Sequence, residues 1–578
     1  MAQSDDLGVL DNLVTQFSSP LDCFRELVQN SIDAGSPSVE VWTEYIPGDG
    51  HEGTVALHVD DYGEGMDENI IDHQFTRLFA STKEEDLTKI GKFGIGFVSV
   101  FALKPKAILV QTGRGGEYWE VLFHEDRSFS KSKLDVPVEG TQLTLFLEGD
   151  IHRYTELVEG IQKTLKHWCN HSETEVTFED RTPVDGGFSD VVVINEPFEV
   201  EGKCLTRVEH QGTEIVAAYT HEPVYGFYNR GLTLALTRAG DDVLGFRAHR
   251  FRHIAFKIKS RYLEHTLSRE TVMRDENYEK AMKLLEEAVD KQLFGALVDE
   301  LERLAQKPEW TLPEIDRYGE FVSYLEHEPI ELLEAIEKRP FIRLLDGKTI
   351  HLDALYEAWK RDGRVLVADG PSDLTDELSA LDVPVVYGRP PTSSTYDHPL
   401  EPVRRLIRRY LTHRVETTLV GRIRKFFGQN LKTKTSGSLT APEDVYLPVV
   451  LDKEVPEEAK PLVETAARLL KEIDAGYRKL TTCELGSPDD DAPLFVLART
   501  LGPVMARPPR GVAEDRPAKR PEAAVNRDHP HFRRLLQLHA HSPEIASYCL
   551  AKSLLLTEDR LLDADVDLIA ASMPAAAQ

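Results

Sequence analysis

Three polar residues of the stretch Phe24-Arg-Glu-Leu-Val-Gln-Asn-Ser-Ile-Asp-Ala-Gly35 have a spacing that can do chemistry. Glu26, Asn30 and Asp33 stand four and then three residues apart, which places them on one face of a helix. On that face Asn30 can offer an amide oxygen to Mg²⁺, and Glu26 can polarise an attacking water. The same spacing is also typical of an ordinary solvated helix surface, so the spacing alone does not distinguish a functional site from such a surface.

Two glycine motifs follow at intervals of about thirty residues. In Asp61-Tyr-Gly-Glu-Gly-Met66 a carboxylate after a predicted strand can accept a hydrogen bond from an exocyclic amine, and the glycines let a base approach the backbone. Gly94-Ile-Gly96 opens an apolar helix, whose free amides and dipole favour phosphate. DxGxG alone is common in turns, and the second motif fits neither a Walker A nor a Rossmann context. In this order, the three motifs describe a pocket for ATP and Mg²⁺.

The elements that must position these motifs are helices over one face of a mostly antiparallel sheet. Apolar residues at helical spacing predict one helix from Pro20 to Ala34, ended by Gly35-Ser-Pro37, and another over 94–103. Alternating apolar residues predict strands at 39–43, 54–59, 107–111, 118–123 and 141–147. The fold class predicted for this part is α+β.

The rest of the chain is predicted to be α/β and then mainly helical. Strands at 191–194, 215–219, 232–236 and 255–259 precede a long amphipathic helix over 276–304, and 364–387 forms a small βαβ unit. The stretches 433–443, 484–493 and 502–524 have the composition of loops or disordered linkers. We expect domains over 1–180, 185–305, 306–400 and 401–578.

Composition and charge restrict which partners the protein can bind and in which compartment it is expected. The net charge of −30 opposes binding to a nucleic acid. The arginines of 404–425 could form a local basic patch, but a solvated helix face is the simpler interpretation. The five cysteines are widely spaced and form no CxxC motif, which disfavours a disulfide framework or a zinc site and favours a reducing cytosol. We find no apolar run long enough to span a membrane and no secretion signal, so we expect a cytoplasmic protein.

With Gly140-Thr-Gln-Leu-Thr-Leu as a fourth motif, roughly residues 15–150 resemble the GHKL ATPase superfamily. The resemblance implies a Bergerat-type α/β sandwich that binds ATP with Mg²⁺. It makes Glu26 the general base, Asn30 the magnesium ligand and Asp61 the adenine contact, with Thr141 supporting that contact. Residues 67–92 would form a lid over ATP. The nucleotide contacts that it implies are Asn30, Asp33, Asp61, Gly65, Met66, Ser81, Thr82, Lys83, Gly94, Ile95, Gly96, Phe97 and Thr141.

Within that superfamily the closest pattern is that of the heat shock protein 90 chaperones. The stretch RELVQNSIDA resembles their RELISNASDA, and the segment from His253 to Val272 resembles their middle domain, which makes Arg269 the arginine that reaches the γ-phosphate. The stretch Val525–Leu535 is similar to the start of their dimerising helices, and we expect its histidines at a surface or an interface and not on a metal. The resemblance implies a homodimeric, ATP-hydrolysing chaperone that acts on client proteins in protein folding and the stress response.

Two departures from the chaperone pattern keep other functions open. Tyr62 stands where that family has asparagine, and Ala80 stands where its lid has lysine, with the neighbouring glycine missing. The chain resembles a divergent, compact prokaryotic member. A GHKL regulatory or defence switch, in which ATP gates an interaction with slow or no turnover, is the alternative. A DNA-processing clamp is opposed by the charge.

Overall fold

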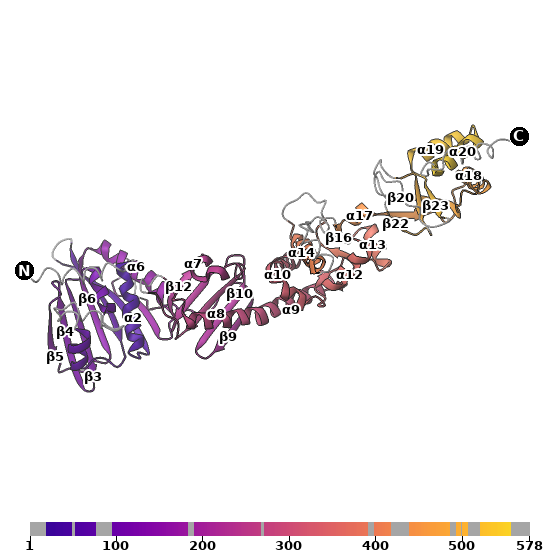
Figure 1. Ribbon diagram of the computed structural model, residues 1–578. Coiled ribbons are helices and arrows are strands. Elements are labelled where there is room, and N and C mark those ends of the chain that lie inside the picture. The colour runs from indigo at the N-terminus through magenta and orange to yellow at the C-terminus, as the bar shows by residue number, and fades with distance from the viewer. Residues whose placement is uncertain are drawn as a thin grey trace, which may run out of the picture. The chain divides into compact units, whose positions relative to one another are not determined.

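The computed structural model describes residues 19–48, 52–76, 95–182, 190–266, 271–390, 398–417, 438–485, 493–498, 500–506 and 521–555. The chain divides into two compact units, Met1–Ala296 and Leu297–Gln578 (Figure 1). That division falls within the helix that the sequence predicts over 276–304.

The first unit begins with a mixed eight-stranded sheet in the order β5-β4-β3-β6-β2-β1-β7-β8. Its neighbouring strands are antiparallel except for β1 and β7, which are parallel. The five strands predicted between 39 and 147 are confirmed and extended, whereas the strand predicted over 191–194 covers only Val192–Val193 and belongs to this first sheet. The bounds are β1 (Ser38–Ile46), β2 (Gly53–Asp61), β3 (Ala107–Arg114), β4 (Glu117–His124), β5 (Phe129–Lys133), β6 (Thr141–Gly149), β7 (Glu175–Asp180) and β8 (Val192–Val193).

Helices cover one face of this sheet, as the predicted α+β layer requires (Figure 1). Helix α2 (Cys23–Asp33) follows a short turn, Pro20–Asp22, that Ser19 caps with its side chain. Phe24 and Val28 of α2 pack in one core with Ile161 and Leu165 of α6 (Ile151–Cys169). Shorter helices are α3 (Glu68–Ile70), which runs into a π turn at Ile71–Phe75, and α5 (Ile95–Val98), which runs into a 3₁₀ turn at Ser99–Leu103.

The opposite face of the sheet carries an aromatic stack. The rings of Trp42 and His58 lie parallel with their centroids 3.3 Å apart, and the guanidinium of Arg181 covers the Trp42 ring at 3.7 Å. Trp42 Nε1 donates to Asp60 Oδ2 at 2.8 Å, and His58 Nδ1 lies 3.0 Å from Thr144 Oγ1. Burial, with a smaller contribution from Arg181, lowers the pKa of His58 to about 4.

The lowered pKa of His58 predicts acid sensitivity of this domain. Folding favours the neutral ring of His58. This group therefore contributes its full stabilisation of the fold above its pKa of 6.5 in the unfolded chain, and the contribution is lost as the pH falls toward about 4. The free energy of unfolding should fall by about 3 kcal/mol over that range through this group. Urea unfolding at several pH values should show the loss in the wild type and a flatter profile in His58→Gln.

The exposed His152, with 79% of its side chain accessible, supplies the matched control for this measurement. His152→Gln should keep the acid sensitivity of the wild type, because it removes an exposed imidazole and leaves the buried ring of His58 in place. Parallel profiles for the wild type and His58→Gln would contradict the prediction.

A second, five-stranded sheet completes the first unit, in the order β12-β11-β13-β10-β9. Strands β11 and β13 are parallel, whereas the other neighbours are antiparallel. The helix predicted over 276–304 is confirmed, with a π turn at Val289–Leu293 between its two parts. The bounds are β9 (Lys203–His210), β10 (Thr213–Tyr219), β11 (Tyr225–Asn229), β12 (Leu232–Thr237), α7 (Gly240–Leu244), β13 (Ile254–Ser260), α8 (Glu276–Ala288) and α9 (Phe294–Ala305).

The second unit starts with helices beside a small parallel sheet of order β17-β16-β18. The predicted βαβ unit is confirmed as β16, α13 and β17, and β14 pairs with β15 in a separate ladder. The bounds are α10 (Leu312–His327), α11 (Ile330–Ala335), β14 (Ile342–Arg343), β15 (Thr349–Ile350), α12 (Leu352–Asp362), β16 (Val365–Ala368), α13 (Asp373–Ala380), β17 (Val385–Tyr387), α14 (Glu401–Thr417), β18 (Leu439–Thr440) and α17 (Pro442–Val445).

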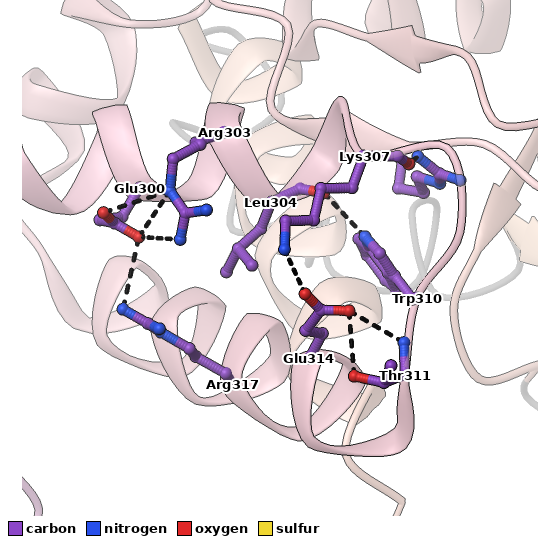
Figure 2. Close-up of polar contacts among 9 residues, drawn as sticks. Glu300, Arg303, Leu304, Lys307, Trp310, Thr311, Glu314 and Arg317 are labelled. Atoms are coloured by element: carbon purple, nitrogen blue, oxygen red, sulfur yellow. Dashed lines mark hydrogen bonds and ion pairs between the residues drawn. The ribbon is translucent and has the colours of Figure 1, made fainter.

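A network of polar contacts fixes the turn between α9 and α10 (Figure 2). Glu314 accepts from the backbone N of Thr311 at 2.9 Å and from its hydroxyl at 3.0 Å, which forms a capping box at the start of α10. Lys307 also contacts Glu314, and these bonds lower the pKa of Glu314 to about 2. Trp310 Nε1 donates to the carbonyl of Leu304 at 2.7 Å. Side chains therefore supply hydrogen-bond partners to backbone groups at the end of α9 and at the start of α10.

The arginine-rich stretch predicted as a possible basic patch forms part of α14. Arg405 pairs with Glu326 at 2.9 Å, Arg414 pairs with Glu337 at 2.8 Å, and Arg409 donates to the carbonyl of Glu328 at 2.7 Å. These three side chains therefore bind acidic segments of their own unit. Residues 418–437, which contain the rest of the stretch, lie outside the described ranges.

The C-terminal part contains a five-stranded sheet of order β21-β23-β20-β19-β22 beside the helices that the sequence predicts. The prediction of a loop over 502–524 was wrong at both of its ends, which pair as strands, and 507–520 lies outside the described residues. The bounds are β19 (Tyr446–Leu451), α18 (Lys460–Glu472), β20 (Lys479–Leu485), β21 (Phe495–Ala498), β22 (Val504–Ala506), β23 (Glu522–Asn526), α19 (Pro530–His539) and α20 (Pro543–Leu555).

Candidate functional site

Asp61 is a buried carboxylate at the end of β2, as the sequence predicts. Only 9% of it is exposed. Its Oδ1 accepts from the backbone N of Gly63 at 2.9 Å and of Thr141 at 3.3 Å, and its Oδ2 lies 3.2 Å from the hydroxyl of Ser31 on α2. Burial raises the pKa of Asp61, while these three hydrogen bonds oppose the rise. Because a carboxylate oxygen can accept more than one hydrogen bond, Oδ2 keeps capacity for a further donor.

The turn after Asp61 is held between α2 and β3. Gly65 has φ +64°, and a Cβ there would lie 2.2 Å from the carbonyl oxygen of Gly113, so no larger residue fits. Glu64 N donates to the carbonyl of Ala34 at 2.9 Å, and Met66 N donates to Thr112 Oγ1 at 2.9 Å. This part of the backbone is therefore fixed from both sides.

Thr112 and Ser31 support the site and were missed from the sequence. Thr112 Oγ1 lies 3.1 Å from Thr141 Oγ1 and donates to the carbonyl of Gly140 at 3.0 Å, which ties β3 to the strand that bonds Asp61. The alternation of Ile108 and Val110 continues to Thr112 and could have extended the predicted strand to it. Ser31 follows Asn30 and lies on the apolar stripe of its helix, where a polar residue signals a buried contact.

Glu26 and Asn30 lie one turn apart on α2, Glu26 with 7% exposure and Asn30 half-buried. A Cβ atom on Gly96 would come within 2.9 Å of Glu26 Oε2, so the glycine lets α5 approach this carboxylate. Mg²⁺ prefers oxygen ligands and commonly combines one or two protein ligands with phosphate oxygens and water. The amide oxygen of Asn30 beside Glu26 therefore fits the magnesium ion that the motif implies.

Asp33, the third residue of the predicted face, is the most exposed of the three. Its Oδ2 lies 3.3 Å from Gln29 Nε2, and its Oδ1 lies 3.5 Å from Arg230 Nη1, which belongs to the second sheet of the same unit. In this structure Asp33 contacts the neighbouring domain, and its contact with nucleotide stays a prediction.

The predicted phosphate-binding residues are only partly described. Phe97 is 4% exposed, and its ring lies in the core against Phe75 and Phe123, with centroids 4.6 and 5.3 Å apart, so its backbone alone remains for phosphate. Ile95 starts α5. Ser81, Thr82, Lys83, Gly94 and Arg269 lie outside the described ranges.

Tyr62 faces away from Asp61. Its hydroxyl donates to Glu40 Oε1 at 2.9 Å, and its backbone N donates to Ser36 Oγ at 2.8 Å. Burial, followed by the bond to Glu40, raises the pKa of Tyr62 to about 12. Glu40 stands opposite Asp60 in the register of β1 and β2, on the face of the sheet opposite to the inward-facing Asp61. The replacement of the family's asparagine by Tyr62 therefore leaves the Asp61 side of the turn unobstructed.

Two of the tail histidines, His529 and His541, make local backbone contacts. His529 Nδ1 accepts from the backbone N of His531 at 3.0 Å and caps α19, and His541 Nδ1 lies 3.2 Å from the carbonyl of Gln537. Across the part of the chain that the structure describes, no three His, Cys, Asp or Glu side chains gather into a metal-binding group. Nor does any helix within those ranges have the length and apolarity to cross a membrane.

Comparison with known proteins assigns a class to this architecture. Residues 19–145 match the family described as histidine kinase-, DNA gyrase B-, and HSP90-like ATPase. The match covers α2, the Asp61 turn and most of β6. The N-terminal domain is therefore a GHKL-type ATPase domain, in a chain of mixed α+β architecture.

The most informative relatives are bacterial chaperones. Chaperone protein HtpG of Desulfotalea psychrophila (strain LSv54 / DSM 12343) is 30% identical over 181 residues, which cover 27% of this chain and 29% of that protein. Chaperone protein HtpG of Myxococcus xanthus (strain DK1622) is 30% identical over 157 residues, 24% of this chain and 23% of that protein. The matched part spans less than a third of each relative's length. The chain is thus a divergent relative of GHKL ATPases of the heat shock protein 90 type.

Proposed function

We propose that this protein is an ATP-dependent chaperone in which binding and hydrolysis of ATP with Mg²⁺ drive a homodimeric clamp that acts on client proteins in the cytoplasm. The observation that carries the proposal is the Asp61 carboxylate, which is buried beside α2 and oriented by Ser31, Gly63 and Thr141. Similarity to proteins named chaperone protein HtpG supports the chaperone part.

Each residue of the site has a separate task in this proposal. Asp61 Oδ2 accepts a hydrogen bond from the exocyclic amine of adenine, because its other oxygen already receives two backbone donors. Asn30 would hold the Mg²⁺ ion, which neutralises phosphate charge when bound. Glu26 orients the attacking water and takes its proton as the oxygen approaches the γ-phosphorus. Arg269 stabilises the charge that develops on the γ-phosphoryl oxygens.

The alternative is an ATP-gated regulatory or defence switch. The observation that favours it is Ala80, which stands where the chaperone lid has lysine. A site that binds ATP but lacks a competent lid would dimerise without turning over. The two proposals share a binding site and differ in the rate of phosphate release.

The decisive experiment measures phosphate release from MgATP by the full chain, together with small-angle scattering with and without a non-hydrolysable ATP analogue. We expect turnover that the analogue inhibits, and a more compact dimer when the analogue is bound. A chaperone should also suppress aggregation of a heat-unfolded test protein in a manner that needs hydrolysis. Tight ATP binding and dimerisation without turnover would favour the switch, and absence of ATP binding would overturn both.

A further inference from the structure

Three side chains from distant parts of the first unit meet where its second sheet adjoins the end of α6. Lys257 lies on β13, Tyr228 on β11, and His171 in the loop after α6. Lys257 Nζ lies 2.8 Å from His171 Nε2, and the rings of His171 and Tyr228 meet edge to face with their centroids 5.1 Å apart. An amine, an imidazole and a phenol thus form one cluster, which includes none of the residues assigned to the nucleotide.

The hydrogen bonds of His171 define which of its nitrogens carries a proton. Nδ1 lies 3.1 Å from the backbone carbonyl oxygen of Glu196, which can only accept, so Nδ1 is the donor. Burial, followed by the charge of Lys257, lowers the pKa of His171 and so favours the neutral ring. Nε2 is therefore the acceptor of the bond from Lys257 Nζ, and it is placed to take a proton from that nitrogen.

Lys257 has the environment of a nucleophilic amine. The residue is half-buried, and burial lowers the pKa of Lys257. Three exposed carboxylates oppose that shift, those of Glu196, Glu199 and Glu201. Within the described ranges none of these or other carboxylates lies close enough to Nζ to form an ion pair. A lysine that is buried without an ion pair loses its proton more readily, and this is the type of lysine that forms Schiff bases.

Lys259 offers a direct comparison, because it stands two residues further along β13 on the same face of the sheet. Its Nζ lies 2.8 Å from Glu214 Oε2 and 4.9 Å from the centroid of the Phe198 ring. Its ammonium group is therefore paired with a carboxylate of a residue that is only 9% exposed. Of these two lysines, Lys257 is the one whose nitrogen has a neutral proton acceptor beside it.

Tyr228 has a hydroxyl group for which the described part of the chain supplies no hydrogen-bond partner. The side chain is fully buried. Burial raises the pKa of Tyr228, so the hydroxyl stays protonated. A Cβ on Gly226 would lie 3.1 Å from Tyr228 Oη and 3.0 Å from Lys257 Cγ, so the hydroxyl and the lysine flank the same glycine. Because buried polar groups normally have partners, an unused donor beside an amine indicates a place for an acceptor oxygen.

We propose that Lys257 is a covalent site for small uncharged aldehydes, with His171 as its base and Tyr228 as the donor to the carbonyl oxygen. The lone pair of Lys257 Nζ forms a C–N bond while the π electrons of the C=O bond move to the oxygen, which the Tyr228 hydroxyl stabilises. His171 Nε2 takes each proton that the neutral amine loses and passes it to that oxygen. The amine and the aldehyde therefore give an imine and one molecule of water.

The three glutamates around the cluster select the class of electrophile. Glu196, Glu199 and Glu201 act on the amine through their negative charges, because they oppose the lowered pKa of Lys257. Such charges repel anionic electrophiles, for example acyl phosphates and 2-oxo acids, and they stabilise the cationic, protonated form of an imine. An uncharged aldehyde is not repelled.

Reductive labelling of the full chain compares the two lysines within one molecule. Propanal with sodium cyanoborohydride near neutral pH converts an imine at either nitrogen into a stable N-propyl amine, which peptide mass spectrometry locates. Lys257 should be labelled faster than Lys259 by about tenfold or more, because general-base catalysis typically contributes more than that. Labelling of Lys257 at the rate of Lys259, or more slowly, would overturn the proposal.

Two variants and a second aldehyde test the separate roles. His171→Gln keeps an oxygen that accepts from Lys257 but cannot take a proton, so labelling of Lys257 should fall to the rate of Lys259. Tyr228→Phe keeps the buried ring and removes the donor, so it should slow Lys257 alone. Unchanged selectivity in either folded variant would overturn the role of that residue. Glyoxylate, an anionic aldehyde, should label Lys257 with little preference, and a preference equal to that of propanal would overturn the uncharged class.

Discussion

Asp61→Asn is expected to abolish ATP binding while the domain stays folded. The asparagine carbonyl can replace Oδ1 as the acceptor for Gly63 and Thr141, but its NH₂ group then occupies the place of Oδ2. That donor would face the adenine amine, so two donors would meet in a buried site. Affinity should fall roughly 100-fold or more, since a buried polar group left unpaired at a recognition site costs that much or more. Calorimetric titration with ADP, which does not depend on hydrolysis, measures the loss.

The next residue, Tyr62, provides the matched control for Asp61→Asn. Its hydroxyl bonds Glu40 on the opposite face of the sheet, so Tyr62→Phe removes a polar contact beside Asp61 without changing the site. Tyr62→Phe should bind ADP like the wild type. Retention of wild-type ADP affinity by Asp61→Asn would refute the adenine contact.

Glu26→Gln is expected to stop turnover and preserve nucleotide binding. Glutamine keeps the shape of a side chain that lies against Gly96 but cannot accept the proton of the attacking water. Loss of a general base costs roughly 10²–10⁴-fold in rate. Single-turnover phosphate release measures that loss, and calorimetry with a non-hydrolysable analogue shows whether binding persists. Glu26→Ala should give the same result with somewhat lower stability.

A second carboxylate of the same domain controls for nonspecific effects of charge removal. Glu120 lies on the outer face of the sheet and accepts from Gln111 Nε2 at 2.8 Å, so Glu120→Gln should hydrolyse ATP at the wild-type rate. If Glu26→Gln also hydrolysed ATP at that rate, another group would have to be the base, and the mechanism proposed for this site would be wrong.

Local patterns were sufficient to predict the first elements of the site. Phe24, Val28 and Ile32 mark the buried stripe of α2 at helical spacing, and the glycines after Asp61 mark the turn. Because the polar residues of α2 interrupt a helix with a strong apolar stripe, they could be predicted as candidate site residues before any contact was known. The α+β layer followed from these elements and their neighbours.

The supporting contacts could not be predicted, because they join residues far apart in the chain. Thr141 donates to Asp61 across 80 positions, and Arg230 reaches Asp33 across 197 positions. A single sequence gives the residue types but not the register that brings them together. Helix α6 was within reach of the sequence, because Tyr154, Ile161 and Leu165 keep helical spacing. The C-terminal strands were harder to predict, since two of them lie at the ends of a segment rich in proline and charge.

The parallel pairing of β1 with β7 has a consequence for any shortened form of the domain. Ser38 of β1 lies opposite Glu175 of β7. The family match ends at residue 145, so a chain that stops there lacks the second neighbour of β1. A fragment that ends at 145 would leave β1 as an exposed edge strand and uncover the core that α6 protects, which favours aggregation. During synthesis on the ribosome, the ATPase fold likewise cannot close before β7 has emerged.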